Sequence, residues 1–144
     1  MFESNINFKV NPGTFKKDPN SSDLGKKIVN QSIELIDEIG FEKFTFKKLA
    51  ARIDSTEASI YRYFENKHLL LTYLVIWYWK WMQYQLILCT QNISCPKHRL
   101  ENCIVKLTSA IQQDHVFEQV NETLLQKIVI AESSKVYLHK DVDA

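Results

Sequence analysis

The side chains best placed to do chemistry in this sequence are small and polar, and they suit the edges of DNA base pairs: Thr56, Glu57, Ala58 and Ser59. The hydroxyls of Thr56 and Ser59 can donate or accept a hydrogen bond, and Ala58 is small enough to touch a thymine methyl. The carboxylate of Glu57 can accept from a cytosine amino group. These residues can read bases only if a helix presents them to the major groove.

The surrounding sequence predicts such a helix, as the second of a pair. Apolar residues recur three and four positions apart from Phe46 to Ile53, behind Thr45, whose hydroxyl suits a helix N-cap. Residues 54–56 interrupt this pattern, and apolar spacing resumes from Ile60 to Phe64 with Thr56 as the second cap. Two short helices joined by a tight turn form a helix-turn-helix, a common DNA-reading unit.

The segment from about Leu24 to Leu74 resembles the tetracycline-repressor (TetR) family of bacterial transcription regulators. The residues that carry the resemblance are Leu49-Ala50-Ala51-Arg52, Ser59-Ile60-Tyr61-Arg62-Tyr63-Phe64, Asn66-Lys67 and Leu69-Leu70, with Ile36, Ile39-Gly40-Phe41 and Phe44-Thr45 upstream. Hydrophobic spacing, turn position and an aromatic helix end agree, so the resemblance is specific.

The resemblance assigns backbone contacts as well as base contacts. Tyr61 and Tyr63 match positions that contact the sugar-phosphate backbone, and Lys67 matches a lysine that clamps a phosphate. Thr45 and Lys47, at the start of the preceding helix, also suit phosphate. Such contacts set the register on DNA without selecting its sequence. For either tyrosine alone, half-buried packing with a solvated hydroxyl is an equally reasonable interpretation.

The turn departs from the family pattern at Asp54, where relatives generally have glycine because the backbone there takes positive φ. Aspartate tolerates that conformation better than most residues, so we expect the turn to form at a small cost. Ser55 stands where valine is frequent and is expected to loosen the turn slightly.

Composition favours an all-α protein, because the 144 residues include only three glycines and three prolines and no long alternating segment. We expect an extended or partly ordered arm over residues 1–21, either lying along DNA phosphates or frayed. A three-helix DNA-binding domain over residues 22–66 follows. Its first helix runs from about Leu24 to Ile39, and Gly40 ends it.

A long linking helix is predicted from Asn66 to about Cys89, with a continuous apolar seam. Trp77, Trp81 and Tyr84 on it are candidate ligand-binding residues, since aromatic rings suit an apolar pocket. The alternative is that these rings belong to the core and to a subunit contact.

The region 67–144 is expected to form a helical regulatory and dimerisation domain. Helices are predicted over 96–113 and from about Phe117 to Leu138. The first of them should point five side chains inward: Leu100, Cys103, Ile104, Leu107 and Ile111. The family usually carries further helices, so this domain is expected to be short or truncated: either the chain is a fragment or it dimerises differently.

Several other classes of function lack support in the sequence. Cys89, Cys95 and Cys103 form neither a disulfide framework nor a zinc motif, and no catalytic set, metal site or cofactor motif is visible. The apolar run after residue 69 is too short to cross a bilayer, and no signal peptide is recognisable. The net charge of +1 is uninformative, but residues 43–67 hold six Lys/Arg against three acidic residues.

The resemblance therefore implies a cytoplasmic bacterial repressor. It would bind double-stranded DNA at a palindromic operator as a homodimer, under the control of a small-molecule effector. The alternative is a helical protein-interaction module that retains the helix-turn-helix fold. Salt-dependent DNA binding distinguishes the two.

Overall fold

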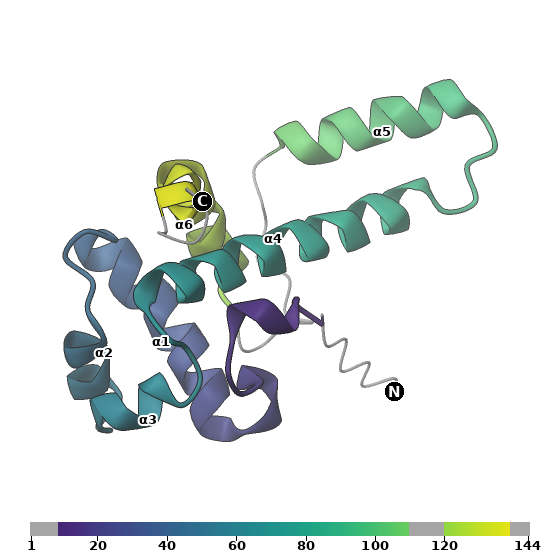
Figure 1. Cartoon of the computed structure of the whole chain (residues 1–144). Helices are drawn as coiled ribbons and strands as arrows, with labels where there is room; N and C mark the ends of the chain where they lie inside the picture. Colours follow the sequence, from purple (N-terminus) through teal and green to yellow (C-terminus); the bar gives the residue numbers. More distant parts are fainter. Residues whose placement is uncertain (1–8, 110–119, 139–144) are drawn as a thin grey trace.

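The computed structural model describes residues 9–109 and 120–138, and within these ranges the protein is all-helical (Figure 1). The elements are the 3-10 turns η1 (Pro12–Thr14) and η2 (Pro19–Ser21), the α-helices α1 (Asp23–Ile39), α2 (Phe46–Arg52), α3 (Glu57–Tyr61), α4 (Lys67–Thr90), α5 (Pro96–Thr108) and α6 (Glu122–Glu132), and the 3-10 turn η3 (Ser133–Leu138). The all-α fold predicted from the sequence is confirmed.

The first three helices form the head of the molecule, and local capping sets their ends. The hydroxyls of Ser22, Thr45 and Thr56 accept backbone N–H groups in the first turns of α1, α2 and α3. Gly40 ends α1 with φ 80°. Phe41 and Phe44, both fully buried, follow it and fill the space among the helices. These features agree with the sequence prediction.

The turn between α2 and α3 depends on a residue in the left-handed region. Asp54 has φ 55°, and the N–H of Ser55 returns to the carbonyl of Ala50 at 2.9 Å. Lys27 of α1 supports the turn by donating to the carbonyl of Ile53 at 3.1 Å. The expected positive φ is confirmed, and it places α3 across α2.

This conformation makes Asp54 a test of backbone strain. Asp54→Ala should lower the free energy of unfolding by about 1 kcal/mol, because a Cβ in this region meets the following carbonyl without the local hydrogen bonding open to aspartate. Asp54→Gly should stay within about 0.5 kcal/mol of wild type, since glycine adopts positive φ freely. Urea denaturation of the three proteins measures the order, and equal losses in both variants would exclude strain as the cause.

Residues 9–21 belong to the arm that was expected to be extended or partly ordered, and they pack on the helices. They form η1 and η2 and cover α1 and α4, with Val10, Thr14 and Pro19 buried. Phe15 meets the ring of Tyr73 of α4 edge-on, with centroids 6.0 Å apart. In Figure 1 this segment lies directly against α4. The isolated apolar residues showed no helical period because each is inserted separately into a different place in the core.

Helix α4 connects the head to the rest of the molecule. Its buried side chains extend from Leu70 to Gln85; α6 contacts α1 and α4, and η3 contacts α4 and α6. One hydrophobic core therefore runs from the head into the body without interruption. The sequence predicted this helix to within one residue at each end.

The side chains that the sequence predicted to point inward from helix α5 are not buried in the structure. It contacts α4 as an antiparallel partner in Figure 1, and none of its residues is buried. Leu100, Ile104 and Leu107 are 62%, 50% and 46% exposed. The helical period identified the apolar face, but α4 covers it only in part: Cys103 is half-buried, and the other three described residues of this face stay exposed. Ile111 and Phe117 lie outside the described residues.

Candidate nucleic-acid interface

The recognition helix α3 is anchored by one side chain and exposes most of the others. Ile60 is fully buried, whereas Glu57, Ala58 and Tyr61 are exposed and Ser59 is half-buried. Because the helix has only five residues, its orientation depends on Ile60 and on the turn before it. The sequence-predicted base-reading residues are therefore brought together at the surface.

The start of this helix is organised by two hydroxyls. Thr56 accepts the N–H of Ser59 at 3.2 Å, and the two side-chain oxygens lie 2.8 Å apart. Each hydroxyl retains hydrogen-bonding capacity, because a hydroxyl has one donor and two acceptor sites. This pair holds polar groups at a position where they can approach a base edge.

The beginning of α2 lies beside the end of α3. The rings of Phe46 and Tyr61 meet edge-on with centroids 5.0 Å apart, and Tyr61 remains 43% exposed. Thr45 and Lys47, next to Phe46, are also exposed. The structure therefore joins the expected phosphate-contacting residues of α2 to Tyr61 in one surface.

Tyr63 is placed differently. It is 3% exposed, and its hydroxyl lies 2.6 Å from that of Ser22. Its carbonyl accepts the N–H of Lys16 at 2.8 Å, and the amino group of Lys17 lies 5.1 Å from its ring centroid. Tyr63 joins α1 and the N-terminal segment to the end of α3, so its side chain does not belong to the exposed surface.

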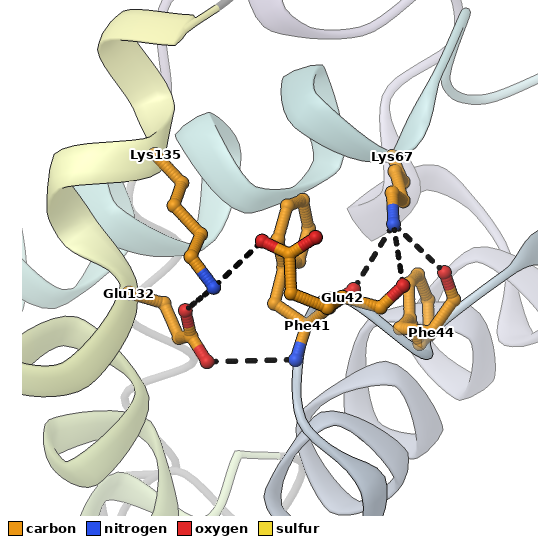
Figure 2. A network of polar contacts seen from close by, with 6 residues as sticks. All are labelled: Phe41, Glu42, Phe44, Lys67, Glu132 and Lys135. Atoms are coloured by element: carbon orange, nitrogen blue, oxygen red, sulfur yellow. Dashed lines mark hydrogen bonds and ion pairs between the residues drawn. The ribbon is translucent and has the colours of Figure 1, made fainter.

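The side chain of Lys67 binds the loop between α1 and α2 through the loop's backbone carbonyls (Figure 2). Its amino group donates to the carbonyls of Phe41, Glu42 and Phe44 at 3.0, 3.3 and 3.1 Å. It also lies 4.6 Å from the ring centroid of Phe41. All three donors of the ammonium are in use, so contact with a phosphate would require one of these bonds to be exchanged.

The same loop is held by the C-terminal part of the chain, as Figure 2 shows. Lys135 of η3 pairs with Glu42 at 2.9 Å and with Glu132, which also accepts the N–H of Phe41 at 3.5 Å. The hydrogen bond with Lys135 lowers the pKa of the Glu42 carboxyl below its ordinary value. The loop that precedes α2 therefore touches both α4 and η3.

Other basic side chains near the recognition helix differ in availability. Arg52 pairs with Glu34 and Glu38 of α1, and Lys48 donates to the carbonyl of Lys43. In contrast, Lys47 and Arg62 are exposed and form no ion pair within the described part of the chain. These two are the available cations beside α3.

Arg62 was not among the DNA-contacting residues predicted from the sequence, although its position in the sequence indicates such a contact. It is the C-cap of α3 and lies four residues after Ala58, so both occupy one face of the helix. A basic residue one turn beyond a small base-facing residue is well placed for the DNA backbone.

The aromatic candidates for ligand binding lie mostly inside. Trp77 and Trp81 are 6% and 2% exposed, and Tyr84 is half-buried. Within residues 9–109 and 120–138, Nε1 of Trp81 and Nε2 of Gln85, one turn apart on α4, have no hydrogen-bond acceptor. Leaving a buried donor unpaired is costly, so an acceptor from a ligand would be favourable there.

The head matches a known family of proteins. Residues 28–74 match the family described as bacterial regulatory proteins, tetR family. A search of curated proteins and a search of solved structures each found no significant match. No helix in the described ranges has the length and apolar character to cross a bilayer, and those residues include no cluster of metal-binding side chains.

Proposed function

We propose that the protein is a repressor. The match of residues 28–74 to the tetR family of bacterial regulatory proteins implies a DNA-binding transcription regulator with a helix-turn-helix. The proposed repressor binds a palindromic operator as a homodimer in the bacterial cytoplasm, with residues 22–66 contacting DNA and residues 67–144 regulating it. A small-molecule effector in the helical body controls its affinity.

The observation that carries this proposal is the exposed surface of α3 and the start of α2. Glu57, Ala58 and Ser59, with Thr56 as the cap, are the proposed base-reading residues. Thr45, Lys47, Tyr61 and Arg62 are the proposed backbone contacts, and Lys67 remains a candidate that must first release a carbonyl. Tyr63 is left out because it is buried.

The experiment that tests DNA reading is selection of bound sequences from random duplex DNA by the full chain. Recovery of an inverted repeat supports both sequence recognition and two-fold pairing. A direct repeat or a single half-site would contradict the dimer, and recovery of no common sequence would contradict specific recognition. Ser59→Ala should change the preferred bases within each half-site, because its hydroxyl faces base edges in this proposal.

The backbone contacts predict a particular response to salt. Lys47→Ala and Arg62→Ala should each weaken binding to all sequences similarly and reduce the salt slope of the binding constant by about one. Lys97→Ala, which removes an exposed lysine on α5, is the matched control and should leave the slope unchanged. Gel-shift titrations at several salt concentrations measure the slopes. An equal effect of all three substitutions would contradict the proposed surface.

For the dimer, the supporting observation is the apolar surface of α4 and α5. Leu100, Ile104 and Leu107 follow a four-then-three spacing, and Trp79 and Ile87 of α4 are 54% and 52% exposed. This spacing resembles a helix-packing seam, and a second copy brings an identical seam to it. We therefore propose that the two copies pair through these two helices.

Ile104→Lys tests that arrangement. The substitution should convert a dimer to a monomer, because it introduces an unpaired charge at the centre of the apolar surface. Helical content should stay unchanged, since Ile104 is 50% exposed. Sedimentation velocity measures the change in mass, and Lys106→Ile, on a half-buried neighbour, is the control that should stay dimeric. An Ile104→Lys dimer would place the interface elsewhere.

The proposed effector site is the interior beside Trp77, Trp81 and Tyr84. The unpaired donors on Trp81 and Gln85 support it, since a ligand acceptor would satisfy them. Such a ligand regulates only if it prefers one of two conformations of the protein. Because α4 runs from this interior to the head, a shift of α4 would change the spacing of the two recognition helices.

A further inference from the structure

A cavity of about 490 Å³ lies between the N-terminal segment and the middle of α4. Its apolar lining includes Val10, Phe15 and Ile76. The volume is within the range typical of small-molecule sites. Its lining includes none of Trp77, Trp81 and Tyr84, the residues of the proposed effector site.

Three charged residues line the cavity: Lys9, Lys80 and Asp18. Asp18 is already used, because it accepts the backbone N–H of Asn20 at 2.9 Å and caps η2. The side chain of Asn20 is hydrogen-bonded to the Tyr73 hydroxyl, whose pKa is raised by burial and by the charge of Asp18. Neither lysine has an ion pair or hydrogen bond within the described part of the chain. Two lysines against one aspartate give the lining a formal charge of +1.

We propose that this cavity binds a small amphipathic anion, a carboxylate or phosphate on a short apolar chain. The head group faces the ammonium groups of Lys9 and Lys80, where opposite charge stabilises it. The chain lies against Phe15 and Ile76, where burial removes apolar surface from water.

The N-terminal wall of the cavity connects directly to the end of the recognition helix. Lys16 and Lys17 follow the cavity residue Phe15 in the sequence and precede the cavity residue Asp18. The N–H of Lys16 donates to the carbonyl of Tyr63, and the amino group of Lys17 lies over its ring. Tyr63 follows the last residue of α3 by two positions. A ligand that favours one arrangement of residues 9–21 therefore shifts α3 as well. This regulatory part rests on the proposed function, whereas ligand binding itself does not.

Isothermal titration calorimetry on the full chain without DNA tests the site, with octanoate, octyl phosphate and uncharged 1-octanol as probes. At least one anion should bind saturably at one site, and 1-octanol should bind at least about tenfold more weakly, because the alcohol lacks the charge-assisted contacts. Comparison of the two anions distinguishes a carboxylate site from a phosphate site. Equal affinities of all three probes, or no binding of either anion, would overturn the proposal.

Two variants locate the binding. Lys80→Met keeps most of the side chain and removes its charge, so anion affinity should fall about tenfold while 1-octanol is unaffected. Ile76→Trp should fill the cavity and weaken all probes. Lys97→Met on α5 is the matched control. Unchanged anion affinity in Lys80→Met would overturn the site even if Ile76→Trp does not fold.

A separate experiment tests regulation: the affinity of the protein for its operator is measured with and without saturating anion. A shift of at least about threefold in wild type, absent in Lys80→Met, supports coupling between the cavity and α3. An unchanged operator affinity would overturn the coupling. If the anion binds and no operator can be found, the proposed function fails while the cavity assignment stands.

Discussion

Replacing Ala58 by glutamate is expected to reduce operator affinity by about a hundredfold or more. The new carboxylate would stand beside Glu57 on the exposed face of α3, close to the phosphates flanking the groove. Bringing like charges together across an interface costs several kcal/mol, and each 1.4 kcal/mol corresponds to about tenfold in affinity. The helix itself should be retained, because an acidic residue in the first turn is favourable there.

The control for this substitution is Ala131→Glu, at an exposed alanine of α6 far from α3 in the fold. It changes the net charge by the same amount, so any general effect of charge on DNA binding appears in both variants. Fluorescence anisotropy with the selected operator measures the two affinities, and circular dichroism verifies the helices. Comparable losses in both variants would show that α3 is not the surface that meets DNA.

Replacing Trp77 by alanine should lower the free energy of unfolding by about 3–5 kcal/mol, because a large buried ring leaves a cavity that the core can only partly close. Trp77 is 6% exposed and lies on α4 where this helix belongs to the shared core. Denaturant unfolding followed by circular dichroism measures the change. The loss is expected with or without an effector, since it depends on packing alone.

Trp79 provides the matched comparison, two residues further along the same helix. It is 54% exposed in the single chain, so in the Ile104→Lys background, where the proposed α4–α5 pairing is removed, Trp79→Ala should change stability by less than about 1 kcal/mol. The pair removes the same atoms from the same helix and differs in burial. Similar losses at both positions in the Ile104→Lys background would contradict the assignment to burial, whereas a larger loss at Trp79 in the dimeric wild-type background is expected, because a second copy covers this ring.

The sequence by itself determined the features that depend on neighbouring residues. The caps at Thr45 and Thr56 and the helix end at Gly40 follow from the local chemistry of each side chain, whereas the positive φ at Asp54 was implied by the family resemblance. The apolar period likewise predicted the long fourth helix. Such features are predictable because the groups that satisfy each backbone donor or dihedral lie within a few positions in the chain.

Only the tertiary structure decided which exposed-looking polar residues are available to DNA. Tyr63 and Lys67 lie in the same motif as Tyr61, yet Tyr63 is bonded to Ser22 and Lys67 to the carbonyls after α1. These partners lie more than 20 residues away in the sequence. Motif spacing contains no information on them, because a long side chain can reach either solvent or a distant backbone group.

Whether a whole segment is buried likewise depended on the tertiary structure. An amphipathic period shows that α5 has an apolar face, but only the neighbouring elements determine whether that face is covered, and Leu100 remains exposed. Conversely, Val10 and Phe15 show no period and still enter the core one by one. Local chemistry therefore determines where helices begin and end, whereas coverage and access depend on contacts between residues far apart in the chain.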